Sequence, residues 1–325
     1  MLPERVTPHP SLFVSDKISQ LHAALQAGDM RALARGITLV ESGLADGAVL
    51  LHLLRRTAST RVVGITGPPG AGKSTLVAGL LRHWTGAGMR VGVVAVDPSS
   101  PFHFGALLGD RIRMAEFYTH PQVFIRSLAS RGALGGLHPH IIEVTDVMKE
   151  AGFDVVLVET VGVGQSEVEI AGLADCTVVA LVPEAGDTVQ TMKAGLLEIA
   201  DIFVVNKADR DGADAMLRAL KILAHEQGST GQETPVIATS ATTGAGVEEL
   251  SAAILRSLEN AGRNETRCLR LLTEKTIQLI RLSRMQDVHR ASVEAALMEV
   301  INEPSFNLYS FAESLAHSGS ALPAS

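Results

Sequence analysis

Cysteines, aromatic residues and basic charge are all scarce in this 325-residue sequence. Its two cysteines, Cys176 and Cys268, exclude a disulfide framework and a cysteine-rich metal site. Aromatic residues make up 4% of the chain against 30 glycines, which favours tight turns between strands and helices over a β-sandwich. The formal net charge of −7 opposes broad binding of nucleic acid, because neutralising phosphates requires a local excess of Lys and Arg.

Long apolar runs are also absent from the sequence. The longest ones have the length of a strand, and the N-terminal residues lead into no stretch that a signal peptide requires. We therefore expect a soluble, cytoplasmic protein with no membrane partner and no nucleic-acid partner. The apolar fraction of 46% is ample for a core, and 325 residues suit one large domain with extensions or two domains.

Short β-branched runs alternate with helix-length segments in the middle of the chain. This alternation is typical of βαβ units, so it predicts an α/β fold built on a mostly parallel central sheet. The predicted strands span residues 62–66, 91–96, 154–159, 177–182, 202–206 and 236–239. We assign residues 60–261 to this domain.

Helical segments flank the central domain on both sides. Apolar residues recur every three or four positions after Asp29, a residue suited to an N-cap, so residues 1–59 are predicted to form an N-terminal helical extension. These apolar positions are Met30, Leu33, Ile37 and Val40. Helical spacing returns in residues 262–325, which are too few to bury a core alone. We expect this C-terminal arm to pack on the main domain or on another chain.

The strongest motif is a phosphate-binding loop. Residues 67–74, Gly-Pro-Pro-Gly-Ala-Gly-Lys-Ser, match G-x-x-x-x-G-K-[ST] between a predicted strand and a predicted helix. Backbone N–H groups of such a loop converge on phosphate oxygens, Lys73 adds charge at the β- and γ-phosphates, and Ser74 offers a hydroxyl to Mg²⁺. The predicted nucleotide-binding residues here are Gly67, Gly70, Ala71, Gly72, Lys73, Ser74 and Thr75.

A second motif selects the nucleotide base. Asn206-Lys207-Ala208-Asp209 follows an apolar strand and matches the N-K-x-D pattern of GTPases. The Asp209 carboxylate can accept from both the ring N–H and the exocyclic amine of guanine, whereas adenine lacks that amine and leaves the charge unpaired. Ser240 and Ala241, after the last predicted strand, suit a backbone contact to the guanine carbonyl. The sequence therefore predicts binding of GTP and GDP.

Acidic residues end two of the predicted strands. Glu159 closes one of them, where a phosphate-loop protein places a Mg²⁺ carboxylate, and Gly162 can offer its N–H to the γ-phosphate. Gln165 is not assigned as the residue that positions water, because Val163 directly follows the glycine. Asp97 closes another strand and is a candidate for holding Mg²⁺ or orienting the attacking water.

Asp110 is a further acidic candidate for the metal site, so the predicted metal set is Ser74, Asp97, Asp110 and Glu159. Neither a catalytic base nor a water-positioning residue can be assigned from the sequence. The histidines at positions 103, 120, 138 and 140 form no long His-rich tract, and we predict that they cap turns or face solvent.

Several strings together resemble one family. They are Asp97-Pro-Ser-Ser-Pro, Leu108-Gly-Asp-Arg-Ile-Arg-Met, Glu159-Thr-Val-Gly-Val-Gly-Gln-Ser-Glu and Asn206-Lys-Ala-Asp-Arg. These look like the MeaB/ArgK family of G-protein chaperones of adenosylcobalamin-dependent methylmalonyl-CoA mutase, and the resemblance covers residues from about 30 to 317. It implies GTP hydrolysis with Mg²⁺, a homodimer formed through the C-terminal arm, and gating of cofactor loading and protection of the mutase.

The resemblance also suggests roles for single residues. Asp97, Asp110 and Glu159 match the metal-site acids of the family, and Lys193 matches a basic residue of a third mobile segment. The catalytic candidates are Lys73, Asp97, Gly162 and Lys193. The sequence departs from the family at His103-Phe104 and at Glu184, both in expected switch segments, so these changes bear on switching and not on nucleotide binding.

Two other functions stay open at this point. One is a nucleotide-dependent kinase linked to amino-acid transport, against which the guanine motif argues, since most kinases use ATP. The other is a metal-insertion GTPase, which the sparse His and Cys disfavour.

Overall fold

The structure is a computed structural model of the 325-residue chain. It describes residues 15–54, 60–97, 114–129, 138–160, 166–183, 198–227, 234–261, 265–285, 288, 290–301, 303 and 306–317. The chain divides into two compact units, Met1–Asn264 and Glu265–Ser325.

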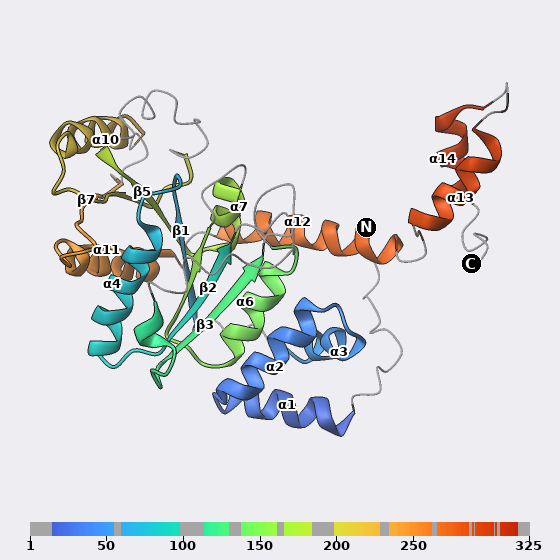
Figure 1. The fold of residues 1–325 in the computed structure, drawn as a ribbon, viewed down its shortest axis with the longest axis horizontal. Helices are drawn as coiled ribbons and strands as arrows, with labels where there is room; N and C mark the ends of the chain where they lie inside the picture. The colour runs from blue at the N-terminus through green and yellow to red at the C-terminus, as the bar shows by residue number, and fades with distance from the viewer. Residues whose placement is uncertain are drawn as a thin grey trace. The chain divides into compact units, whose positions relative to one another are not determined.

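A seven-stranded sheet forms the centre of the first unit (Figure 1). Its strands are β1 (Arg61–Thr66), β2 (Val91–Asp97), β3 (Val123–Ala129), β4 (Val155–Glu159), β5 (Cys176–Leu181), β6 (Ile202–Val205) and β7 (Val236–Ala238). They lie in the order β3-β2-β4-β1-β5-β6-β7, and each neighbouring pair is parallel. The predicted α/β fold is confirmed. Since all strands run the same way, their carboxyl ends share one edge of the sheet.

Strand β3 is not among the strands that the sequence predicts. Its residues include Arg126 and Ser127, which interrupt the apolar run, and β3 lies at the edge of the sheet. An edge strand packs on fewer neighbours than a central strand, so its residues need not all be apolar. The Arg126 guanidinium pairs with the Glu41 carboxylate of the N-terminal helices.

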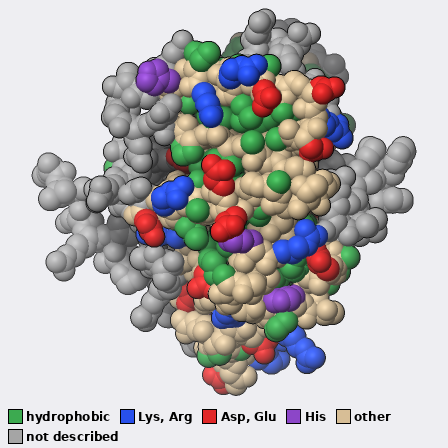
Figure 2. Space-filling view, turned by 90° about the vertical axis from the view of Figure 1, so that its left-hand side faces the viewer, with side chains coloured by type: hydrophobic (Ala, Val, Ile, Leu, Met, Phe, Trp, Pro, Cys, Tyr) green, Lys and Arg blue, Asp and Glu red, His purple; other side chains and the backbone are tan. Residues whose placement is uncertain are grey.

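Helices cover both faces of the sheet. On one face lie α4 (Lys73–Gly86) and α11 (Val247–Ala261), and on the other lie α6 (Ile141–Glu150), α7 (Ser166–Leu173) and α10 (Ala213–Gln227). Trp84 of α4 is fully buried, and its indole N–H donates to the Ser251 hydroxyl of α11 at 2.7 Å. A short 3₁₀ helix, η1 (Ala115–Phe117), precedes β3. Figure 2 looks onto the side where α10 and α11 lie and shows basic and acidic side chains interspersed among apolar ones.

The N-terminal residues form three helices, α1 (Asp16–Gln26), α2 (Met30–Glu41) and α3 (Ala45–Leu53). Asp29 caps α2 as predicted, because its carboxylate accepts from the backbone N–H groups of Arg31 and Ala32 at 2.7 and 2.8 Å. The apolar face of α2 packs with α6 over the sheet. In the described part of the chain no single helix is long and apolar enough to cross a membrane. Taken together, α2 and α3 have the length and the apolar composition of a membrane span, but the chain bends by 118° between them.

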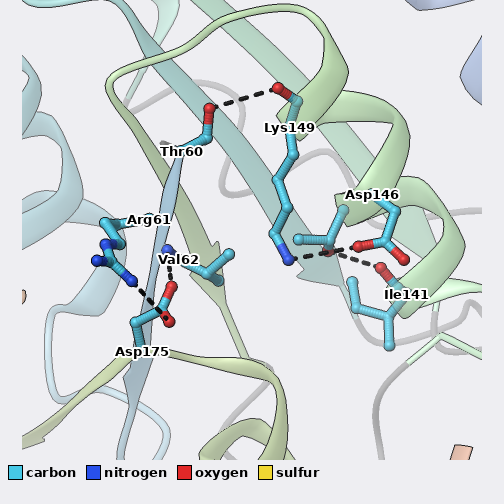
Figure 3. Close-up of polar contacts among 8 residues, drawn as sticks. Thr60, Arg61, Val62, Ile141, Asp146, Lys149 and Asp175 are labelled. Atoms are coloured by element: carbon cyan, nitrogen blue, oxygen red, sulfur yellow. Dashed lines mark hydrogen bonds and ion pairs between the residues drawn. The ribbon is translucent and has the colours of Figure 1, made fainter. Parts of the chain in front are cut away.

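Hydrogen bonds and an ion pair fix the amino end of β1, and Figure 3 shows those that involve Asp175 and Lys149. The Asp175 carboxylate accepts from the backbone N–H of Val62 at 2.8 Å and lies 3.8 Å from the Arg61 guanidinium. The buried Thr60 hydroxyl donates to the Phe153 carbonyl at 2.7 Å. These contacts lie at the end of β1 opposite to the phosphate-binding loop.

The second unit consists of α12 (Glu265–Arg284), α13 (Arg290–Val300) and α14 (Leu308–His317), as the helical spacing predicts. Many large apolar side chains of this unit are exposed. They include Leu269, Leu279, Ile280, Met285, Met298, Ile301, Leu308 and Tyr309.

Candidate nucleotide-binding site

The phosphate-binding loop connects β1 to α4, as the motif predicts. Gly67, Gly70 and Gly72 have φ values of +138°, +78° and +79°, which residues with a Cβ rarely adopt. A Cβ on Gly67 would lie 2.0 Å from the Ala180 carbonyl oxygen of β5, and one on Gly72 would lie 2.4 Å from the Asn206 amide nitrogen. The loop therefore runs against both a neighbouring strand and the guanine motif with no room for larger residues.

Lys73 folds back over this loop. Its ammonium group is buried and donates to the carbonyl oxygens of Gly67 and Pro68 at 2.9 and 3.1 Å. Lys73, Ser74 and Thr75 make up the first turn of α4, where the backbone N–H groups have no acceptor within the helix and, together with the helix dipole, favour an anion. The charged group and the helix end thus point to the same place, which suits the phosphates of a nucleotide.

Two buried carboxylates end β4, which lies beside β1, and β2, the next strand along the sheet. Glu159 ends β4, and one of its carboxylate oxygens accepts from the Ser74 hydroxyl at 2.6 Å. Asp97 ends β2, the other neighbour of β4, and is fully buried. Since Glu159 pairs with Ala95 in the sheet register, the two acidic residues lie within two positions of each other along adjacent strands. Ser74, Asp97 and Glu159 therefore gather at one edge of the sheet.

Asn206 links the guanine motif to the phosphate-binding loop. Its side-chain amide donates to the Ala71 carbonyl at 2.8 Å, while its side-chain carbonyl accepts from the Thr239 hydroxyl and the Ala241 N–H at 3.1 and 3.2 Å. All four residues are buried. The side chain thereby joins three segments that lie far apart in the sequence.

The rest of the guanine motif has the shape of an exposed turn. Lys207 adopts a φ of +55°, and the N–H of Ala208 donates to the Thr239 carbonyl at 2.9 Å. This turn leaves the Asp209 carboxylate exposed, and a hydrogen bond from the Ser240 side chain lowers its pKa below the ordinary value. Ser240 hence lies beside Asp209, as expected for residues that surround one base.

Several predicted residues lie outside the described part of the chain. They are Gly162, Lys193 and Asp110, together with His103, Phe104, Gln165 and Glu184. The predicted residues that the structure brings to the carboxyl edge of the sheet are Gly67, Gly70, Ala71, Gly72, Lys73, Ser74, Thr75, Asp97, Glu159, Asn206, Lys207, Asp209, Ser240 and Ala241.

Sequence reasoning missed the part played by threonines that follow strands. Thr239 comes directly after β7, and its hydroxyl holds Asn206. The sequence holds a signal for this role, because a small polar residue that directly follows an apolar strand lies at the carboxyl edge of the sheet. From there its side chain can form hydrogen bonds with residues that follow the adjacent strands. His138 is buried at the turn before α6, where its ring accepts from the His140 N–H at 3.1 Å, so it caps a turn as predicted.

A phosphate-binding loop, a guanine motif and two strand-end carboxylates at one edge of a parallel sheet define a P-loop GTPase. The model of one family, described as methylmalonyl Co-A mutase-associated GTPase MeaB, matches residues 33–295. The chain belongs to this family, and it is a GTPase.

Known proteins agree with this assignment. A Pyrococcus horikoshii protein named as a GTPase is 51% identical over 238 residues, which cover 72% of this chain and 75% of that protein. The methylmalonic aciduria type A homolog of Mus musculus, named as mitochondrial, is 37% identical over 263 residues, covering 73% of this chain and 63% of the mouse protein. A crystal structure titled LAO/AO transport system kinase is 27% identical with a TM-score of 0.63, and the match covers 94% of this chain and 98% of that one.

Proposed function

We propose that this GTPase is a G-protein chaperone that gates adenosylcobalamin loading and protection of methylmalonyl-CoA mutase or a related acyl-CoA mutase. The observation that carries the proposal is the extent of the family match. Residues 33–295 include most of α2, all of α3 and all of α12, which lie outside the segment that holds the nucleotide site. A likeness restricted to nucleotide binding would not extend into these helices. The name of the mouse relative supports the same partner class.

The site fits a Mg²⁺ ion by the chemistry of its donors. Ser74, Asp97 and Glu159 offer a hydroxyl and two buried carboxylates, and oxygen ligands are those that Mg²⁺ prefers. A divalent cation would balance the negative charge that these acids place in a buried position. When bound, Mg²⁺ neutralises charge on the β- and γ-phosphates. We propose that these three residues hold it.

The chain's own groups account for binding and for only part of catalysis. Lys73 and the first turn of α4 stabilise charge on the phosphates, and Asp209 selects guanine. The sequence places Val163 directly after Gly162, where a water-positioning glutamine would stand in Ras-like proteins. We therefore expect slow hydrolysis by the isolated protein. In GTPases an added charge clamp raises the rate by about 10³ to 10⁵, so a partner that supplies one accelerates turnover strongly.

The decisive experiment measures phosphate release from GTP with and without cobalamin-dependent acyl-CoA mutases of the same organism. We expect the cognate mutase to stimulate release and to bind the GTP-analogue and GDP forms with different affinity. Linkage requires that nucleotide state change mutase affinity by the same factor as the mutase changes nucleotide affinity.

A variant tests the proposed role of Lys193 in the same assay. Lys193→Ala should weaken stimulation, whereas Lys221→Ala on the exposed side of α10 should leave it unchanged. The absence of stimulation by every mutase tested, together with equal mutase affinity in both nucleotide states, would reject the chaperone role and leave the GTPase activity standing.

A further inference from the structure

Strand β7 lies at the edge of the sheet, and part of its outer side is unpaired. It is the last strand of the sheet order, so β6 is its one neighbour among the described strands. The Phe203 N–H donates to the Pro235 carbonyl at 2.8 Å, and the Thr239 N–H donates to the Val205 carbonyl at 2.8 Å. Alternate residues from Pro235 to Thr239 therefore direct their backbone groups toward β6.

The residues between them face the open edge. Because successive residues of a strand direct their N–H and C=O groups to opposite sides, those of Val236 and Ala238 point away from β6. No described residue forms a hydrogen bond with the backbone of Val236. The open part ends at Ala238, since a Cβ on Gly246 would lie 2.0 Å from the Ala238 carbonyl oxygen and the Gly246 backbone therefore lies against it.

Pro235 does not protect this edge. A proline on an edge strand commonly prevents pairing with another chain because it has no N–H to offer. The Pro235 carbonyl bonds to β6, so the N–H that proline lacks is missing from the inner side of the strand. Val236 keeps both its outward N–H and its outward C=O, and one residue of an added strand can bond to both.

Two helices border this edge and form a groove along it. α10 and α11 lie on opposite faces of the sheet beside β7 (Figure 1), and the groove that they border has a volume of about 410 Å³. Thr234 and Val236 line its floor, Lys221 lies on the α10 side and Arg256 lies on the α11 side. We call this feature the β7 groove.

The two cations lie at a similar height along β7. Both helices begin at the carboxyl edge of the sheet, and Lys221 and Arg256 lie about 12 and 14 Å along them at 1.5 Å per residue. Both side chains are exposed, and neither forms an ion pair with a described residue. Glu249 also lines the groove, about 10 Å nearer the carboxyl edge than Arg256. The amino half of the groove is therefore basic on both sides.

We propose that the β7 groove binds an extended acidic segment of a second protein as an added strand. The segment bonds to the free backbone groups of Val236. Successive side chains of a strand point to opposite faces, so two consecutive acidic residues place one carboxylate beside Lys221 and the other beside Arg256.

Charge selects this occupant. Lysine near an edge commonly prevents pairing with an arbitrary strand, and an acidic segment is the kind of strand that the two cations attract. Elsewhere the net charge of −7 opposes an acidic partner. The inference goes beyond the proposed function and is independent of it, since Lys221→Ala should leave stimulation by the mutase unchanged.

The experiment titrates a fluorescein-labelled peptide, acetyl-Thr-Val-Glu-Glu-Val-Thr-amide, with the full chain bound to GDP and follows its fluorescence anisotropy. One matched peptide has Lys in place of both Glu residues. A second keeps the acidic residues but carries N-methyl groups at alternate backbone positions, which removes the N–H groups that pair with a strand. The GDP affinity of every variant shows whether its nucleotide site is intact.

The variants separate charge from strand pairing. Lys221→Glu and Arg256→Glu each reverse the charge on one side of the groove, and Arg31→Ala, an exposed residue of α2, is their control. Val236→Pro removes the outward N–H without removing a bond to β6. Val236→Ala is its matched control, because it shortens the same side chain and keeps the N–H.

We expect saturable binding of the acidic peptide and none of the lysine peptide or the N-methylated peptide. Each charge reversal should weaken binding by at least about fivefold, and added salt should weaken it as well. Val236→Pro should abolish peptide binding and leave GDP affinity unchanged, whereas Val236→Ala and Arg31→Ala should bind the peptide as wild type does. If Val236→Pro fails to fold, the N-methylated peptide decides whether a strand is added.

Four results would overturn the proposal. They are no saturable binding of the acidic peptide up to about 1 mM, equal binding of the lysine peptide, undiminished binding of the N-methylated peptide, and a lower mass of the Val236→Pro variant in light scattering. The last result would mean that a second copy of this chain occupies the edge.

Discussion

Single residues of the guanine motif are predicted to determine which base is bound. The side-chain amide of Asn206 both donates and accepts hydrogen bonds that hold three segments together, whereas the Asp209 carboxylate is exposed. The first is a structural requirement of the site and the second is available for the ligand. Their substitution should therefore have different consequences.

Asp209→Asn should relax the preference for guanine while leaving the fold intact. A carboxylate accepts two N–H groups of guanine, and an amide in its place turns one acceptor into a donor. In titrations with labelled nucleotides, wild type should bind GDP at least about a hundredfold more tightly than ADP, and the variant should lose most of that ratio. Comparable affinities of wild type for GDP and ADP would contradict the assignment of the motif.

The pH dependence of Asp209 should change with its neighbour. The Ser240 hydrogen bond is the main cause that lowers the pKa of Asp209, so Ser240→Ala should raise that pKa toward its ordinary value. Because the pKa is lowered in the folded chain, the charged form is retained above the ordinary pKa and is lost only as the pH falls through the lowered one. An NMR titration of the carboxyl carbon measures the shift. Ser42→Ala, directly after α2, is the control and should leave the Asp209 titration where it is in wild type.

At the scale of elements, the glycine positions of the phosphate-binding loop differ in how well they tolerate a side chain. A Cβ added at Gly67 would lie 2.0 Å from a backbone oxygen of β5, whereas a Cβ added at Gly70 would meet no atom within 4 Å. Both residues have a positive φ, so a side chain would strain the backbone at either position. Only at Gly67 would the side chain also collide with a neighbouring strand.

Gly67→Ala should therefore destabilise the protein severely and abolish GDP binding, while Gly70→Ala should cost about 1–2 kcal/mol of unfolding free energy. Denaturant unfolding and GDP titration of the two variants provide the comparison. Equal destabilisation by both substitutions would show that the close approach of the loop to β5 is not what requires glycine at position 67.

For the whole molecule, the second unit is notable because α12 to α14 leave large apolar side chains exposed. The second unit has 61 residues from Glu265 to Ser325 and forms its own contacts, yet Leu269, Met298 and Tyr309 are more than half exposed. Exposed apolar side chains of this kind suit an interface, either with the first unit or with another chain. The homodimer arm therefore stays a prediction.

Deleting residues 265–325 should convert a dimer into a monomer that still binds GDP, because every described residue of the site lies in the first unit. Light scattering gives the mass of the full chain and of the truncated chain, and GDP titration shows that the truncated chain is folded. A monomeric full-length protein, or a truncated protein that stays dimeric, would contradict the role of the arm.

The sequence by itself determined the features that are local along the chain. The phosphate-binding loop, the guanine motif and the strand-end acids are each encoded within a few consecutive residues, and strand and helix periods follow from the chemistry of neighbouring positions. These signals were enough to predict the α/β fold, the GTPase class and the edge of the sheet where the site lies.

Only the tertiary structure decided the contacts that hold those motifs to one another. Asn206 forms a hydrogen bond with Ala71, 135 positions away, and Thr160 forms one with Thr66, 94 positions away. Neither contact can be recognised from the residues near it in the sequence. The edge strand β3 was likewise missed, since its partly exposed surface allows polar residues that hide its period. Local patterns fix which elements form, because they depend on nearby residues. Which side chains meet depends on packing between distant segments, and that is settled when the sheet assembles.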